Sequence, residues 1–338
     1  MALAWTTCFG LLTLIFAQQV HANSIGICYG MTGDNLPSPP DVVALYKKYF
    51  IEKIRIYSPN PEVQNALQLQ DLKVAVGVRN EDIPNIAANQ TAADKWVSTN
   101  ISPYNDSGIQ YVVVGNEVIG SNLGKYVAPA MANLRNSLNS VKLVAIRVTT
   151  SVYTGVLSMS SPPSQGTFSP SVVDDMTAIV SFLNNLPPEN PQHVIMVNVH
   201  PYFAYAADPE HISLEYALFT ATSPVVRDGN LDYYNLFDAM VDAFYAALEK
   251  IGGASIEVVV SETGWPSAGN GNFTTIELAK TYNKNFMNHI ASSGTPKRPN
   301  ISTVGFIYEM FNEDQKPAGV EQNFGLFYPS GQPVYNIF

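Results

Sequence analysis

The chain has 338 residues, of which 46% are hydrophobic and only 14% are charged. This composition can form a large buried core and excludes an intrinsically disordered chain. The 18 basic and 28 acidic side chains give a formal net charge of −10, a sign that repels nucleic-acid phosphates and anionic lipid surfaces. We therefore expect neither nucleic acid nor a membrane as a partner.

The first feature along the chain is an apolar run, CFGLLTLIFA at positions 8–17. A run of this length is too short to span a bilayer and is typical of a signal-peptide core. Val20 and Ala22 stand where small residues precede a cleavage site. The pattern predicts a removed signal peptide over residues 1–22 and a secreted, extracellular product. Five N-x-S/T sequons agree with export: Asn89, Asn100, Asn105, Asn272 and Asn300.

The rest of the chain alternates between strand-like and helix-like segments. Eight short runs rich in β-branched and aromatic residues have the continuously apolar character of strands buried on both faces: 24–30, 51–57, 73–79, 111–118, 143–150, 194–203, 256–263 and 303–311. Seven helical stretches lie between them: 40–49, 61–70, 92–99, 126–139, 172–185, 233–251 and 275–292.

Eight strands alternating with helices predict an α/β protein, a single (β/α)8 TIM barrel domain over residues 23–338. The alternative, an open doubly wound sheet, would need a G-x-G-x-x-G loop after its first strand, and residues 30–40 contain none. The longest insertions, residues 158–170 and 203–232, follow the fifth and sixth strands. We expect them to be rim loops that wall an open cleft at the carboxyl ends of the strands.

Two of the predicted strands end in glutamate. The fourth reads YVVVGNE and ends at Glu117, and the seventh reads VVVSE and ends at Glu262. Active sites of such barrels lie at the carboxyl ends of the strands, and strands four and seven face each other across the ring. Glycoside hydrolysis uses two such carboxyl groups, one to protonate the leaving oxygen and one to attack the sugar or activate water. The alternative is a pair of solvated rim charges.

Five segments carry a resemblance to a known family: IGICYGMTGDNLP (25–37), YVVVGNEV (111–118), VNVHPYFAY (197–205), VVVSETGWPSAG (258–269) and MFNEDQK (310–316). They resemble plant glucan endo-1,3-β-glucosidases of glycoside hydrolase family 17, and the resemblance extends from about residue 25 to residue 338. It implies a monomeric enzyme of the apoplast or cell wall. This enzyme would hydrolyse internal bonds of β-1,3-glucans such as callose, fungal wall glucan or laminarin, without metal or cofactor.

The resemblance also implies residue roles. Glu262 matches the nucleophile of a retaining double displacement, and Glu117 matches the general acid/base. Asn116 would bind near the 2-hydroxyl of the sugar, while Glu313 and Lys316 would act as a supporting acid and base. The chemistry agrees, because an ionised Glu262 would keep a nearby Glu117 protonated, and esterification of Glu262 would remove that repulsion.

Aromatic residues at or beyond the strand ends are predicted to contact glucosyl faces, although rings also fill cores. These candidate residues are Tyr29, Tyr202, Phe203, Trp265 and Phe324. Position 200 departs from the family pattern, because histidine stands there in place of the expected tyrosine. Two alternatives for the function remain open: hydrolysis of mixed-linkage 1,3;1,4-β-glucan by the same architecture, and a wall protein that binds glucan without cleaving it.

Overall fold

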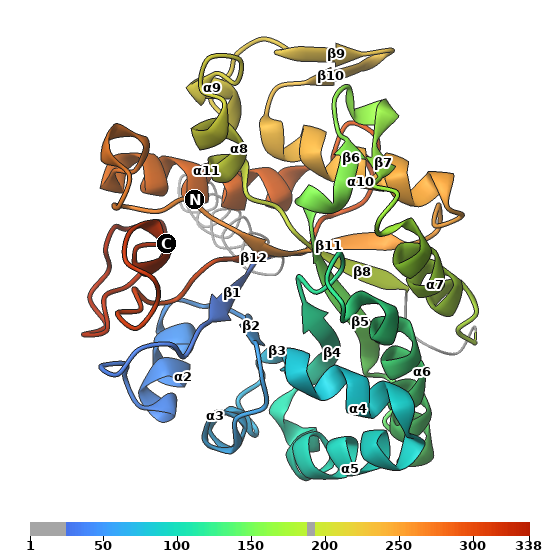
Figure 1. Cartoon of the computed structure of the whole chain (residues 1–338). Coiled ribbons are helices and arrows are strands. Elements are labelled where there is room, and N and C mark those ends of the chain that lie inside the picture. The colour runs from blue at the N-terminus through green and yellow to red at the C-terminus, as the bar shows by residue number, and fades with distance from the viewer. Residues whose placement is uncertain (1–24, 188–192) are drawn as a thin grey trace, which may run out of the picture.

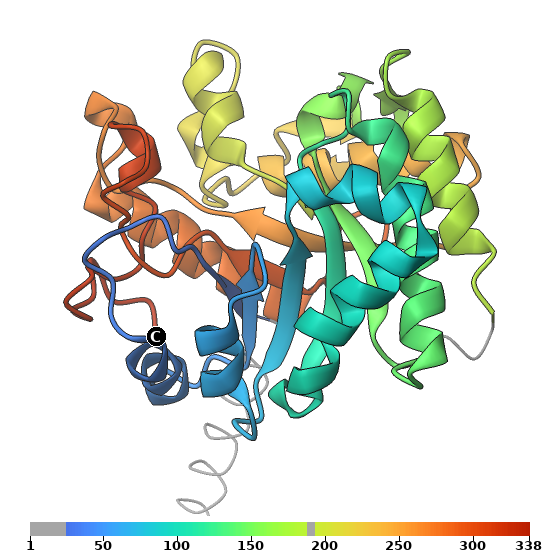
Figure 2. The ribbon, with the colours of Figure 1, turned by 60° about the horizontal axis from the view of Figure 1, so that its bottom comes forward.

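The computed structural model describes residues 25–187 and 193–338. Within them, eight parallel strands close into a barrel in the order β1-β12-β11-β8-β5-β4-β3-β2, with helices around it (Figures 1 and 2). The predicted TIM barrel is confirmed, whereas the predicted signal peptide lies outside the described residues. The barrel strands are β1 (Ile25–Tyr29), β2 (Lys53–Ile56), β3 (Lys73–Val78), β4 (Ile109–Asn116), β5 (Arg147–Tyr153), β8 (Val194–Asn198), β11 (Glu257–Thr263) and β12 (Gly305–Ile307).

Each of the seven predicted helical stretches overlaps a helix, namely α2 (Pro39–Lys48), α3 (Pro61–Leu67), α5 (Gln90–Asn100), α6 (Gly124–Ser140), α7 (Val173–Asn184), α10 (Leu236–Lys250) and α11 (Ile276–Ser292). The clearest pattern belongs to α10, which buries Phe237, Val241, Phe244 and Leu248 on one face. None of the helices in the described part of the chain has the length and apolar content needed to cross a bilayer.

The sequence missed three short helices: α4 (Ile83–Ala88), α8 (Pro201–Ala207) and α9 (Leu214–Ala217). Helix α8 also corrects one strand boundary, because the predicted strand 194–203 ends at Asn198 and Pro201 begins a helix. Proline suits the first turn of a helix, where its missing N–H is not needed. The predicted strand 143–150 is shifted to Arg147–Tyr153, and 303–311 is shortened to Gly305–Ile307.

The predicted rim loops after β5 and β8 contain small elements of their own. Strand β6 (Leu157–Met159) pairs with β7 (Thr167–Phe168), and β9 (Val226–Asp228) pairs with β10 (Leu231–Tyr233), both antiparallel. The second insertion also contains α8 and α9. Both insertions lie on the same side of the barrel in Figure 1.

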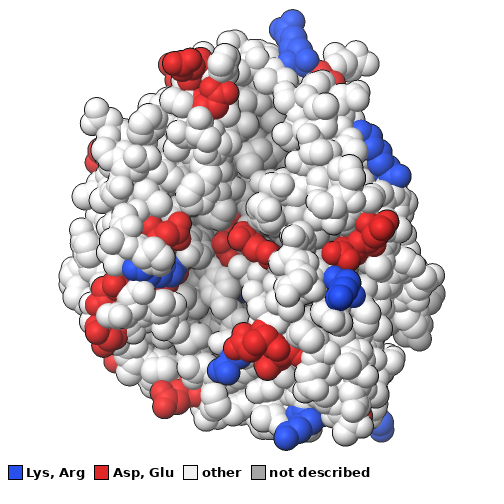
Figure 3. Space-filling model, in the orientation of Figure 1, with Lys and Arg blue, Asp and Glu red and all other residues white. Residues whose placement is uncertain are grey.

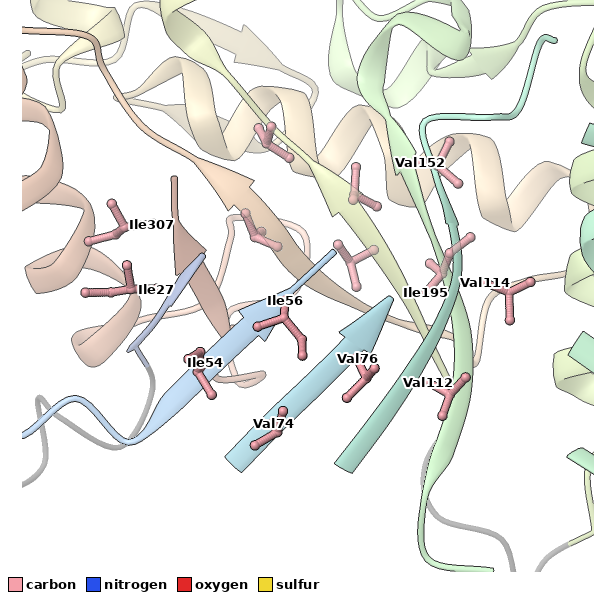
Figure 4. Packing of buried hydrophobic residues seen from close by; sticks show 14 of the residues in the cluster. Ile27, Ile54, Ile56, Val74, Val76, Val112, Val114, Val152, Ile195 and Ile307 are labelled. Atoms are coloured by element: carbon pink, nitrogen blue, oxygen red, sulfur yellow. The ribbon is translucent and has the colours of Figure 1, made fainter. Parts of the chain in front are cut away.

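The core has two layers because barrel strands alternate their side chains between the interior and the helices. Residues such as Ile54, Val74 and Val112 belong to the large cluster between strands and helices (Figure 4). Their neighbours Ala75 and Val113 belong to a second cluster that also includes Cys28, Tyr111, Val194, Met196, Val259 and Phe306. Strands buried on both faces explain why the sequence shows continuous apolar runs rather than alternation.

Candidate active site

A cavity of about 810 Å³ opens at the carboxyl ends of the barrel strands. Both Glu117, which follows β4, and Glu262, in β11, line it, so the predicted juxtaposition of the two carboxyl groups across the mouth is found. The molecular face in Figure 3 is hollowed at its centre, with acidic side chains in the hollow. Other predicted residues that line the cavity are Asn116, Phe203, Glu313, Lys316 and Phe324.

Glu262 is buried and held by a cation and a hydroxyl group. Its Oε1 accepts hydrogen bonds from Nη1 of Arg55 at 2.8 Å and from the hydroxyl of Tyr57 at 2.9 Å. Its Oε2 lies 3.5 Å from Nε2 of His200. Burial by itself would raise the pKa of Glu262, but Arg55, His200 and Tyr57 outweigh that effect and lower the pKa. Glu262 is therefore an ionised carboxylate.

Arg55 is the main site residue that the sequence analysis missed. In β2, which reads KIRI, its neighbours Ile54 and Ile56 face the helices, so Arg55 faces the barrel interior. Besides Glu262, its guanidinium donates to the carbonyl of Ser261 at 2.9 Å and to Oδ1 of Asn116 at 2.7 Å. Strand β2 contains two buried charged residues, Lys53 and Arg55, and charge in a buried strand was the available signal.

Glu117 has a different environment, although it is the same residue type. It follows β4 with a left-handed backbone, φ 56°, and its carboxyl group is open to the cavity. Partial burial raises the pKa of Glu117, the negative charge of Glu262 raises it further, and a hydrogen bond from Asn198 opposes both effects. The pKa values of the two carboxyl groups are thus shifted in opposite directions.

Asn198, at the end of β8, holds the carboxyl group of Glu117. Its Oδ1 accepts hydrogen bonds from Oγ of Ser151 at 2.9 Å and from Oγ of Ser261 at 2.7 Å. These contacts fix the orientation of the amide, so its Nδ2 donates to Glu117 at 2.7 Å and to Asn116 at 3.2 Å. Asn116 accepts both of its side-chain hydrogen bonds at Oδ1, which leaves its Nδ2 as a donor toward the cavity.

Glu313 and Lys316 lie together, as predicted, but they form part of a buried triad rather than an isolated pair. Lys316 lies 2.6 Å from Glu313 and 2.5 Å from Glu309, a residue that the sequence analysis did not select. Burial raises the pKa of Glu309 well above its usual range, and a hydrogen bond with Glu313 adds to this effect although Lys316 opposes it. A Cβ at Gly30 would lie 2.3 Å from Oε2 of Glu313 and 2.4 Å from Oε2 of Glu309. Glycine at this position therefore lets the backbone approach the two carboxyl groups.

The predicted aromatic residues divide into two groups. Phe203, which is 44% exposed, and Phe324 line the cavity, where Phe324 packs against His200 and Tyr308. Tyr29, Tyr202 and Trp265 are 3%, 2% and 0% exposed and are not among the lining residues. Phe324 is itself 1% exposed, so burial alone does not decide sugar contact, and contact of these three rings with sugar stays a prediction. Tyr202 and Trp265 pack together at 5.2 Å behind the site, and Tyr29 packs against Phe311.

A (β/α)8 barrel with two carboxyl groups of opposite pKa shift at one mouth defines the class of barrel glycoside hydrolases. Comparison with known families matches residues 25–338 to glycosyl hydrolases family 17. A probable glucan endo-1,3-beta-glucosidase of Arabidopsis thaliana is 50% identical to this chain over 321 residues, which are 94% of this chain and 91% of the relative.

Lichenase-2 of Hordeum vulgare is 44% identical, over 93% of this chain and 98% of the relative. Among solved structures, a β-1,3-glucanase and allergen of Cryptomeria japonica pollen is 45% identical with a TM-score of 0.88, and the match covers 93% of this chain and 98% of that one. This chain belongs to glycosyl hydrolases family 17, and it is an enzyme that hydrolyses glycosidic bonds.

Proposed function

We propose that this enzyme hydrolyses internal bonds of β-1,3-glucans with retention of configuration, and that it is secreted. The observation that carries the reaction type is the opposite pKa shift of two carboxyl groups that line one cavity. Such a pair supplies a nucleophile and an acid at the same pH. The names of the relatives supply the linkage, since glucan endo-1,3-beta-glucosidases are 50% and 42% identical to the chain.

In the first step, Oε2 of Glu262 attacks the anomeric carbon while Glu117 gives its proton to the leaving glycosidic oxygen. Oε2 is the attacking atom because Oε1 already accepts from Arg55 and Tyr57. A glycosyl ester on Glu262 and a free glucan chain result. The free Nδ2 of Asn116 donates to the 2-hydroxyl of the reacting sugar, a contact that strengthens in the transition state of such reactions.

In the second step, Glu117 takes a proton from water, and the water oxygen attacks the anomeric carbon and releases Glu262. Esterification has removed the charge of Glu262, so the pKa of Glu117 falls and its carboxylate is available as a base. Each product sugar regains the configuration of the substrate, because two inversions occur in sequence. When the ester is cleaved, the negative charge returns to Glu262, where the hydrogen bonds from Arg55 and Tyr57 stabilise it.

Two variants test these roles. Glu262→Gln should abolish hydrolysis of soluble β-1,3-glucan but retain binding of oligosaccharides, because shape is kept and charge is lost. Glu117→Gln should reduce glucan hydrolysis by at least about 10²-fold and spare activated aryl glycosides, which need no acid. Glu210→Gln, at an exposed position, serves as the control. Near-normal glucan hydrolysis by either of the two variants would refute the assignment, as would equal losses of Glu117→Gln on both substrates.

A second candidate substrate is mixed-linkage 1,3;1,4-β-glucan, which the similarity to lichenase-2 favours. Hydrolysis of a β-1,3 polymer, a mixed-linkage polymer and a β-1,4 polymer should be compared, with proton NMR to follow the anomeric configuration. Release of β-configured oligomers from the β-1,3 polymer alone is the expected result. A preference for the mixed-linkage polymer would replace the proposed substrate, and α-configured products would refute retention.

A further inference from the structure

A second cavity, of about 600 Å³, lies outside the catalytic mouth, between the second rim insertion and the first turn of α10, α11 and the segment after α11. The insertion between β8 and α10 contributes to both cavities, since Phe203 lines the first and Phe219 and Tyr234 line the second. Nothing in the proposed reaction uses the second cavity. The side chains that line it nevertheless favour one chemical class of ligand.

Helix α11 turns a polar stripe toward this cavity. Asn285, Asn288, His289 and Ser292 line it at i, i+3, i+4 and i+7, so they share one face of the helix. The apolar face is elsewhere, at Ala279, Tyr282, Phe286 and Ile290. Within the stripe, the amide of Asn285 donates to the carbonyl of Leu218 and the hydroxyl of Ser292 to the carbonyl of Asn288, both at 2.9 Å. Asn288 is exposed there, and its amide is available to a ligand.

Asp238 contributes a fixed hydrogen-bond acceptor beside this stripe. It is 4% exposed, accepts from Nε2 of His289 at 2.7 Å and from the amide of Asn235 at 2.8 Å. The side chain of His289 also packs against Phe219, with ring centroids 5.2 Å apart. These contacts make the polar wall rigid, and a rigid wall loses little entropy when a ligand binds.

Tyr234 supplies an aromatic platform at the rim. It follows β10, lines the cavity and is 45% exposed, although aromatic side chains of the neighbouring residues Tyr233 and Phe237 are both buried at 1%. An exposed ring beside fixed amide groups presents an apolar face and polar partners together.

The lining selects the chemical class of ligand. Neither lysine nor arginine is among the described residues that line the cavity, so the lining itself offers no such cation to a phosphate or carboxylate ligand. Nor does any part of the described chain bring together three His, Cys, Asp or Glu side chains that could hold a metal ion. Asp232 is paired with Arg227 and Asp238 with His289. What remains suits a neutral ligand with many hydroxyl groups and an apolar ring face.

We propose that this second cavity is a non-catalytic binding site for neutral β-glucan chains, with Tyr234 as the stacking platform and Asn288 as a hydrogen-bonding partner. The inference rests on the proposed β-glucan substrate. A second site on one enzyme raises its effective concentration at an insoluble polymer, because dissociation requires release of both sites. The site thus serves attachment to the polymer and leaves cleavage of short soluble chains unaffected.

The test separates binding from cleavage. Each variant is made with Asn300 intact and with Asn300→Gln, because this sequon residue adjoins the lining residue Pro299, and the proposal requires the same dependence on Tyr234 in both forms. Retention on particles of insoluble β-1,3-glucan is measured with Glu262→Gln as background, and hydrolysis of a soluble β-1,3 hexaose is measured with Glu262 intact. Tyr234→Ala is compared with Tyr328→Ala, a control tyrosine with a similar exposure of 43%.

Tyr234→Ala should weaken retention about tenfold or more and leave hexaose hydrolysis within about twofold, while Tyr328→Ala should change neither. Asn288→Ala should weaken retention in the same direction. Equal retention of Tyr234→Ala and Tyr328→Ala would overturn the site, and so would a parallel loss of hexaose hydrolysis. Failure of the parent to cleave any β-1,3-glucan would refute the proposed function instead. In that case, retention would be measured on particles of mixed-linkage glucan and of β-1,4-glucan. Weaker retention of Tyr234→Ala would support the second site, and unchanged retention would overturn it.

Discussion

Replacement of Arg55 by methionine tests the electrostatic basis of the site most directly. The ion pair between Arg55 and Glu262 is 2.8 Å long, and both side chains are under 10% exposed. At an effective dielectric constant of about 20, the attraction at this distance is about 6 kcal/mol, and desolvation of the two charges offsets much of it. Removal of one partner leaves an uncompensated buried charge, so we expect Arg55→Met to reduce the free energy of unfolding by about 3–5 kcal/mol near pH 7.

The same variant should lose activity in a way that depends on pH. Without Arg55, burial dominates and the pKa of Glu262 rises, so the acidic limb of kcat/KM on soluble β-1,3-glucan should move to higher pH. Urea unfolding of Arg55→Met, Glu262→Gln and the double variant forms a double-mutant cycle that isolates the pair. The double variant should recover much of the lost stability. An additive double variant, or an unmoved acidic limb, would refute the electrostatic role of Arg55.

Three further predictions concern titratable groups. Burial raises the pKa of Glu117 and acts in the same direction on the pKa of Glu262, whereas His200 lowers the pKa of both carboxyl groups. His200→Phe should therefore move both limbs of the kcat/KM profile to higher pH. Unchanged limbs would contradict this role of His200. Burial raises the pKa of Asp242 from 3.8 to about 6. Its ionisation therefore disfavours the folded state, and it should remove up to about 3 kcal/mol of stability as pH rises from about 4 to 6. Asp242→Asn should gain stability relative to the parent across that interval in urea unfolding, and a constant difference would argue against it. Glu309→Gln mimics a protonated carboxyl group, so kcat/KM at pH 6 should stay within about threefold of the parent, and a loss above about tenfold would show that Glu309 must ionise.

The sequence predicted the barrel well because strands buried on both faces leave continuous apolar runs. It failed where one short segment changes type, as at Pro201, where a strand-like run passes into α8. At the site, Glu117 and Glu262 could be predicted because they end apolar strands. For Arg55 the sequence shows a charge in a strand-like run, but it does not show which face of β2 points inward, so the contacts of Arg55 could not be predicted. The burial of Trp265 could not be predicted for a related reason: its position after β11 is visible in the sequence, but its packing against Tyr282 of α11 is not.

The irregular ends of the strands explain how two glutamates on a regular barrel come to differ so much. The register between β4 and β5 shifts between Val113 and Asn116, and that between β11 and β8 shifts between Val260 and Glu262. Such irregularities re-aim the side chains that follow them. Glu117 is thereby turned into the cavity beside an amide donor, while Glu262 stays over the guanidinium of Arg55. Because the cation lies under Glu262, whereas partial burial and the charge of Glu262 raise the pKa of Glu117, the barrel itself divides the work into an ionised nucleophile and a protonated acid.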